Sequence, residues 1–152
     1  MLHPFKQTYF ERDNDVPWPV RPVIESDEIA RFRSFVLSRF ANRGIRGDLP
    51  DAMYACIQET VQGVKKYVLV EETAQNVAAM RALLLPGPLE SHASSPAFFT
   101  LDDGEHVYTC TIDEFIRYMD DIWYPSSDDL MCSMPALDVC VGITHDERVF
   151  IV

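Results

Sequence analysis

Residues 97–124, AFFTLDDGEHVYTCTIDEFIRYMDDIWY, predict a hairpin followed at once by a helix, and this combination is the clearest indication of the fold class. Two β-prone runs flank Asp103-Gly104, a dipeptide suited to a tight turn with positive φ. Thr111 and Glu114 then have the spacing of a capping box, in which each satisfies a backbone N–H of the other. The predicted helix carries an apolar stripe, which indicates a core-facing side: Ile112, Phe115, Ile116, Met119 and Ile122.

The residues at the end of the chain predict more antiparallel structure. VCVGITHDERVFIV, residues 139–152, is typical of two strands around a short turn at Asp146-Glu147. Gly142 inside the first of these strands predicts a bulge. A further strand is predicted in VKKYVLVE, residues 64–71, because that run is rich in β-formers.

Helical patterns dominate the first half of the chain. Ser26 is a good N-cap, and apolar residues recur at three- and four-residue spacing as far as Gly44, which predicts one helix. Further helices are predicted over residues 50–63 and 73–86, and the proline- and serine-rich residues 86–96 predict a loop. Runs of helices followed by runs of strands are typical of the α+β class. We therefore expect helices, mainly from the N-terminal half, packed on an antiparallel sheet formed mainly by the C-terminal half.

Residues 1–25 are predicted to form an extended arm rather than a helix or a strand. Three prolines within residues 17–22 favour polyproline-like backbone, and Trp18 is expected to pack the arm onto the body. Residues 26–152 then form a single α+β domain, as the total length of 152 residues suggests.

Acidic residues are concentrated at one end of the chain. Residues 101–152 hold twelve acidic and two basic residues, so nearly all of the net charge of −11 lies there. Such a field repels nucleic acid and anionic lipid and attracts cationic partners. The same charge can also serve solubility alone. No apolar run approaches the ~20 residues of a membrane span, and we expect a cytoplasmic protein with no nucleic-acid or membrane partner.

Candidate reactive groups are few. The cysteines form no CxxC pair and are expected to pack in the core: Cys56, Cys110, Cys132 and Cys140. Cys140 and His145 are five residues apart, so a regular strand points them to opposite faces and disfavours a nucleophile pair. The carboxylates between Asp120 and Asp129 could hold magnesium or calcium, but adjacent helical residues diverge by about 100°. We therefore expect no metal, no cofactor and no catalysis, with a small metal-dependent hydrolase at this cluster as the least favoured alternative.

The same stretch, FIRYMDDIWYPSSDDL, favours a protein interface, because it mixes aromatic side chains with acids. Aromatic anchors slow the dissociation of a complex, and surrounding charge speeds its association with a partner of opposite sign. For Trp123 the alternative of a core residue that ends the helix stays open. The predicted partner-binding residues are Tyr118, Asp120, Asp121, Trp123, Tyr124, Asp128 and Asp129.

Residues 115–130 together with LDVCVGITHDERVFIV, residues 137–152, resemble the closing segment of small acidic bacterial immunity proteins. In those antidotes to polymorphic and contact-dependent toxins, a helix ends in an aromatic-proline turn, followed by paired acids and a final hairpin. Cys140 departs from the large aromatic residue expected after the Leu-Asp pair. The resemblance implies a non-enzymatic inhibitor of one toxin domain, often a nuclease. The alternative is an adaptor or regulatory subunit for a cationic protein that is not a toxin, and the oligomeric state stays open.

Overall fold

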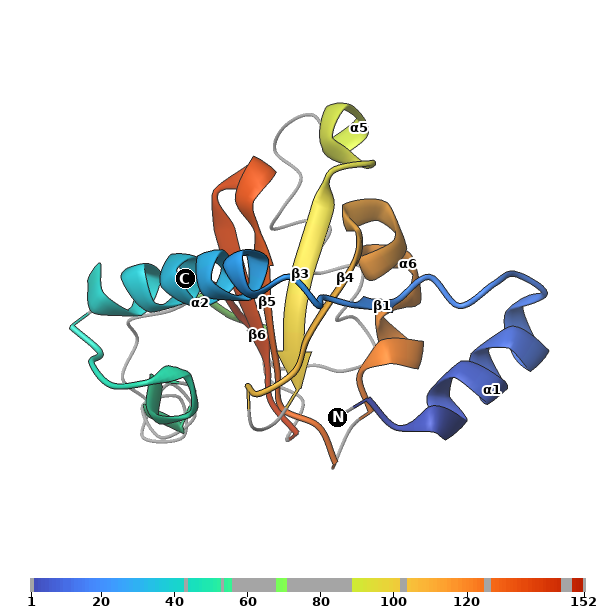
Figure 1. The fold of residues 1–152 in the computed structure, drawn as a ribbon, viewed down its shortest axis with the longest axis horizontal. Helices are drawn as coiled ribbons and strands as arrows, with labels where there is room; N and C mark the ends of the chain where they lie inside the picture. The colour runs from blue at the N-terminus through green and yellow to red at the C-terminus, as the bar shows by residue number, and fades with distance from the viewer. Residues whose placement is uncertain are drawn as a thin grey trace.

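The computed structural model describes residues 2–42, 44–52, 54–55, 68–70, 89–101, 104–124, 127–145 and 149–151. The helices within these ranges are α1 (Pro4–Asn14), α2 (Ser26–Asn42), α5 (Leu89–His92) and α6 (Ile112–Ile122), with a short 3-10 helix, η2 (Pro135–Leu137) (Figure 1). The strands in the same ranges are β1 (Arg21–Pro22), β2 (Val68–Val70), β3 (Pro96–Leu101), β4 (Val107–Thr111), β5 (Leu130–Met134), β6 (Val139–Ile143) and β7 (Val149–Ile151).

The described strands form one sheet in the order β1-β4-β3-β5-β6-β7-β2, and every neighbouring pair is antiparallel. Helices lie mostly in the first part of the chain and strands mostly in the second. The predicted α+β class is therefore confirmed.

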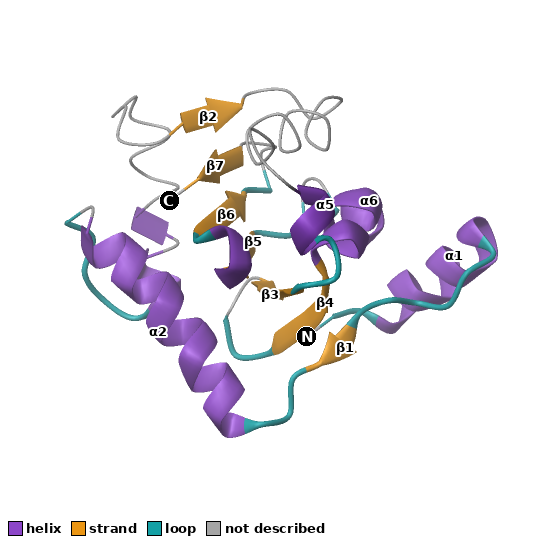
Figure 2. Cartoon of the chain, turned by 90° about the horizontal axis from the view of Figure 1, so that it is seen from above, coloured by secondary structure: helices purple, strands orange, loops and turns teal. Residues whose placement is uncertain are grey.

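Helices cover both faces of the sheet, and Figure 2 shows α2 and α6 on its opposite sides. On one face, Phe115 and Met119 of α6 pack in a core with Phe99 of β3. On the other face, Val36 of α2 packs in a second core with Met131 of β5. Because side chains alternate between the faces of a strand, β5 contributes to both cores, and all five of its residues are buried.

The predicted hairpin and the helix after it are confirmed. Strands β3 and β4 pair in continuous register, and Gly104 has a φ of +69°. The Glu114 carboxylate accepts a hydrogen bond from the Thr111 N–H at 2.8 Å, and the Thr111 hydroxyl accepts one from the Glu114 N–H at 3.2 Å. The five residues of the predicted stripe on α6 are all buried. Asp103 lies outside the described residues.

Other predicted elements are confirmed wholly or in part. Helix α2 begins at Ser26 and ends two residues before Gly44, whose φ is +80°. Residues 49–52 and 54–55 are helical, as predicted for the start of the second helix. The remainder of that helix and the helix predicted over residues 73–86 lie outside the described residues. So does the predicted turn at Asp146-Glu147, although β6 and β7 pair as expected.

One strand of the sheet was missed, and two expectations for this region need correction. Strand β5 was not predicted, because the run LMCSM is apolar on both faces and lacks the alternation of a half-exposed strand. The predicted bulge at Gly142 is wrong, since the register runs without interruption on both of its sides. Residues 86–96 are not entirely loop, because Leu89–His92 form α5 and Pro96 begins β3.

The prediction of an extended segment without helix or strand is wrong for residues 1–25. Pro4 opens α1, where its missing N–H removes no helical hydrogen bond, and Asp15 closes the helix with a left-handed φ of 52°. The following residues lead to the two-residue edge strand β1, and Trp18 packs against the core that includes α6. The division between residues 1–25 and a domain of residues 26–152 stays a prediction.

Candidate partner-binding surface

Helix α1 is anchored beside the end of α6 by a buried cation. The Lys6 ammonium, in a residue only 2% exposed, pairs with the Asp128 carboxylate and donates to the Ile122 carbonyl at 2.8 Å. The Lys6 ammonium also lies 4.5 Å from the centre of the Tyr124 ring. One turn further along α1, the buried Phe10 ring meets the Tyr118 ring edge to face at 4.9 Å. These contacts place α1 and α6 side by side.

Asp128 and Trp123 are structural rather than exposed. The Asp128 carboxylate accepts a second hydrogen bond from the Tyr124 N–H at 2.9 Å, in addition to its pair with Lys6. The Trp123 indole N–H donates to the Asp128 carbonyl at 2.6 Å, and Trp123 is 1% exposed. Burial removes both residues from the surface that a partner could touch, which corrects the predicted set and favours the alternative reading of Trp123.

Asp129 lies in a different environment from its neighbour in sequence. Its carboxylate accepts a hydrogen bond from the His145 N–H at 2.7 Å and lies 2.9 Å from the His145 ring Nδ1. Asp128 instead pairs with Lys6, so the two carboxylates do not converge. Within the described residues, no group of three or more His, Cys, Asp or Glu side chains is arranged to hold a metal ion.

An acidic-aromatic face is formed where α1 and α6 meet. Phe5 and Tyr9 of α1 are 37% and 46% exposed, and their ring centres are 5.7 Å apart. The Phe5 ring stacks on the Tyr124 ring at 5.9 Å with an angle of 13° between the planes. We define the acidic-aromatic face as Phe5, Tyr9, Asp13, Asp120, Asp121 and Tyr124, of which Asp13 and Asp120 are exposed and Asp121 and Tyr124 half-buried.

Repulsion among the carboxylates of this face acts on Asp121, whereas Asp13 is paired with Arg12 at 2.6 and 2.7 Å, which lowers the pKa of Asp13. Burial raises the pKa of Asp121, and the charges of Asp120 and Asp13 raise it further, against an opposing hydrogen bond from Asn14. Burial and the charge of Asp121 likewise raise the pKa of Tyr124. These shifts place Asp120 and Asp13 within electrostatic reach of Asp121, so this part of the face favours an approaching cation.

The backbone of Tyr118 departs from helical geometry inside α6. Its φ of −113° and ψ of 20° interrupt the helix one turn before the helix ends. The following turn carries Asp121, which lies within hydrogen-bond reach of Asn14 at the end of α1. Tyr118 is itself half-buried beneath Phe10, so it supports the face more than it exposes a ring to a partner.

Phe5, Tyr9 and Asp13 were missed by sequence reasoning because the helix that carries them was missed. A signal was present in PFKQTYFERD, where Phe5 and Tyr9 are four residues apart, as are Lys6 and Phe10. Two such pairs, one residue out of phase, occupy neighbouring stripes of a helix. The first stripe is exposed and the second is buried.

The described cysteines pack in the interior, as expected. Cys110, Cys132 and Cys140 are free thiols, and burial raises the pKa of Cys110 and of Cys140 to about 12. A thiol with such a pKa is protonated at neutral pH and is a poor nucleophile. Cys140 is buried while His145 is exposed, in keeping with the rejected nucleophile pair. Cys56 lies outside the described residues.

None of the helices in the described ranges is both long enough and apolar enough to cross a membrane. No family model matches the chain, and no curated protein or solved structure matches it either. The acidic-aromatic face and the chemistry of its side chains are therefore the basis for any functional assignment.

Proposed function

We propose that this chain is a non-enzymatic binding protein that captures a cationic protein on its acidic-aromatic face. The observation that carries the proposal is the stack of Phe5 on Tyr124, with Tyr9 exposed beside it. The nearby Asp121 has a pKa that burial and the charges of neighbouring acids raise. Aromatic anchors in a charged surround are the usual composition of a specific interface. A partner that brings Lys or Arg side chains would relieve the repulsion at Asp121 and bury the exposed rings.

We further propose that the partner is a toxin and that the chain is an inhibitor of the immunity type. The support is the resemblance of residues 115–130 and 137–152 to immunity proteins, together with the acidity of residues 101–152. A nuclease toxin binds phosphates with Lys and Arg, so carboxylates can occupy the same surface in place of phosphates. Association would be fast and sensitive to salt, and dissociation slow.

A metal-dependent enzyme is not favoured by the contacts around the aspartates. Asp128 is held by Lys6 and Asp129 by His145, while Asp121 is hydrogen-bonded to Asn14. Each carboxylate thus already has its own polar partner on the protein, and the three do not share one binding point.

The test is a capture experiment from the native host with three immobilised forms of the protein. The wild type is compared with Asp120→Lys/Asp121→Lys, which reverses two charges on the face, and with Glu25→Lys/Asp27→Lys, which makes the same charge change at exposed residues near the start of α2. A true partner is retained by the wild type and the α2 control, lost from the α6 variant and released by salt. Equal retention by both variants, or no stoichiometric partner, would overturn the proposal.

Activity assays of a captured partner then distinguish an immunity protein from a binding protein whose partner is not a toxin. For an immunity protein, the partner inhibits growth or cleaves nucleic acid, and an equimolar amount of the wild-type chain blocks that activity. A captured basic protein without toxic activity would support the regulatory alternative instead. Phe5→Ala is expected to raise the dissociation rate about tenfold or more, because anchor residues act mainly on residence time.

A further inference from the structure

A second candidate site lies on the opposite side of the sheet from the acidic-aromatic face. A groove of about 740 Å³ runs between the first half of α2 and the neighbouring ends of β3 and β5. Its wall includes Phe32 and Phe35 of α2, Pro96 and Phe98 of β3, Ser133 of β5 and the adjoining Pro135. Pockets that bind small molecules enclose about 300–1,000 Å³ and are mostly apolar. This groove has the size and the lining of such a site.

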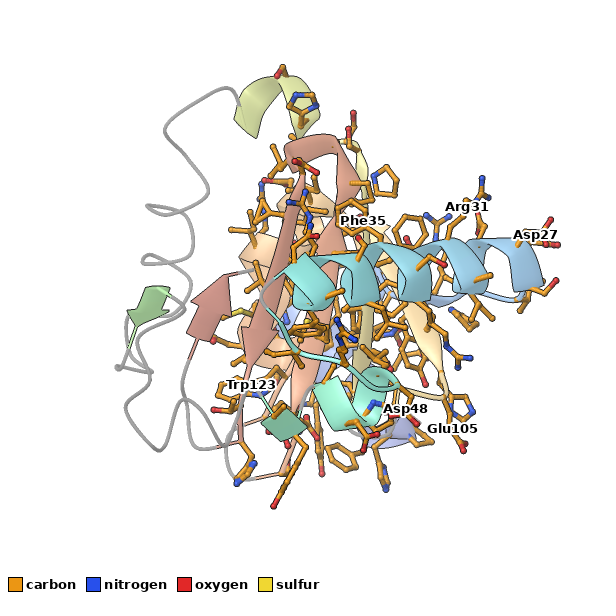
Figure 3. The ribbon with its side chains drawn as sticks, turned by 90° about the vertical axis from the view of Figure 1, so that its left-hand side faces the viewer. Asp27, Arg31, Phe35, Asp48, Glu105 and Trp123 are labelled. Atoms are coloured by element: carbon orange, nitrogen blue, oxygen red, sulfur yellow. The ribbon has the colours of Figure 1, made fainter. Side chains whose placement is uncertain are left out.

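Figure 3 labels Phe35 and Arg31 along α2. Trp123 belongs to the core on the α6 side of the sheet. Arg31 and Glu28 belong to the rim of the groove, where their side chains form an ion pair at 3.9 Å. The rim therefore presents opposite charges that offset each other, and the aromatic wall below it is uncharged. A neutral ligand fits this arrangement better than an ion does.

Ser133 supplies a buried polar group to the groove, in addition to Ser34, which is exposed on α2. Ser133 is 0% exposed, and among the described residues its hydroxyl has no hydrogen-bond partner. Its neighbours Cys132 and Met134 belong to the core on the α6 side, so alternation along β5 directs the Ser133 side chain to the α2 side, where the groove lies. Buried hydroxyls are nearly always paired, and an unpaired one destabilises the fold until some group satisfies it.

We propose that this groove binds a small neutral aromatic molecule that carries one carbonyl or hydroxyl group. The rings of Phe32, Phe35 and Phe98 offer edges and faces to an aromatic ligand. The Ser133 hydroxyl donates to a ligand carbonyl or accepts from a ligand hydroxyl, and it does so away from bulk water. Because the groove shares no residue with the acidic-aromatic face, this site is independent of the proposed partner binding.

The test compares two probes of almost the same shape, acetophenone and ethylbenzene. Each is titrated into uniformly ¹⁵N-labelled full-length protein, and backbone amide shifts are followed by NMR. Saturable shifts are expected around Ala30 to Phe35, Phe98 and Ser133. Acetophenone is expected to bind about fivefold more tightly than ethylbenzene, because one neutral hydrogen bond changes the affinity by about that factor. Absence of saturable shifts at these residues with either probe would overturn the proposal.

Three variants test the location of the site and the hydrogen bond from the Ser133 hydroxyl to the ligand. Ala30→Trp fills the groove from an exposed position and is expected to weaken acetophenone binding at least about tenfold, whereas Ala41→Trp, exposed on the same helix but outside the groove, leaves it unchanged. Ser133→Ala removes the unpaired hydroxyl at little risk to folding and is expected to abolish the preference for acetophenone over ethylbenzene. Equal effects of the two tryptophans, or an unchanged preference in Ser133→Ala, would rule out this site.

Discussion

Helices α6 and α1 lie side by side but are specified in different ways. Helix α6 begins with a complete capping box at Thr111 and Glu114 and buries an apolar stripe of five residues against the sheet. Helix α1 begins at Pro4, the side chain of its N-cap His3 makes no capping hydrogen bond within the described residues, and the helix buries only Lys6 and Phe10. Helix α6 is therefore specified by its own residues, whereas α1 depends on the surface against which it packs.

This difference matters for function because the acidic-aromatic face needs both helices. Asp120 and Asp121 come from the locally encoded helix, whereas Phe5, Tyr9 and Asp13 come from the docked one. Any change that releases α1 would therefore dismantle the face while leaving the core around α6 in place. Four measurements test this difference between the two helices.

The largest effect is expected from Phe115→Ala in α6. Phe115 is 0% exposed, and its ring lies 5.7 Å from that of Phe99 on the sheet. Deleting a buried phenyl ring costs about 3–5 kcal/mol of unfolding free energy. Urea denaturation followed by circular dichroism measures this loss, with the exposed Arg117→Ala on the same helix as control. A loss below about 1 kcal/mol would contradict the role of α6 as a core helix.

The next effect is expected from Lys6→Met in α1. Removing the ammonium leaves the Asp128 carboxylate buried without its cation, which costs about 3 kcal/mol. Hydrogen exchange should speed up in α1 and stay slow in α6, because only α1 loses its anchor. Lys6→Met/Asp128→Asn should recover part of the stability, and Gln7→Met, exposed on the next position, should change little. Uniform acceleration of exchange in both helices would remove the distinction between them.

A smaller effect is expected from matched threonine substitutions. Thr111→Ala deletes the N-cap of α6 and should cost about 1 kcal/mol. Thr8→Ala in α1 removes only an exposed contact of 3.5 Å with the Pro4 carbonyl and should change stability by less than about 0.5 kcal/mol. Thermal unfolding of the two variants measures the difference. Equal losses would mean that α1 is specified as locally as α6.

The smallest effect is a gain from Asp121→Asn. Because burial and neighbouring charges raise the pKa of Asp121, the folded protein binds its proton more tightly than the unfolded chain does. That contribution is fully present below pH 3.8, the unperturbed value, and is lost as pH rises through the raised pKa. At pH 7 the variant should be more stable by less than about 0.5 kcal/mol, since solvent screens this partly exposed group. Melting temperatures from pH 3 to 7 test this, and an advantage that grows on acidification would contradict the sign.

The elements predicted correctly from sequence are those with local signals. The capping box at Thr111 and the positive φ of Gly104 follow from residues within a few positions of one another. Strand β5 carries no such signal, since its burial on both faces comes from helices elsewhere in the chain. Helix α1 was missed for a related reason, because its anchor joins Lys6 to Asp128, a residue 122 positions away.

The candidate site could be predicted only in part for the same reason. The sequence pointed to the acids and aromatics after Tyr118, and Asp120, Asp121 and Tyr124 remain accessible in full or in part. The sequence could not separate Asp128 from Asp129, although one is buried against a lysine and the other lies beside a histidine. That separation depends on contacts between residues distant in sequence, which composition and spacing do not encode.

The order of the strands also has a consequence for synthesis on the ribosome. Strands β1 and β2 form the two edges of the described sheet, and their partners are β4 and β7. A ribosome adds about 5–20 residues per second, so β2 emerges roughly 4–16 s before β7 exists. During that interval β2 has no partner strand to join. The central strands from β3 to β7 follow one another closely in sequence, so they can assemble soon after they emerge and then receive both edges.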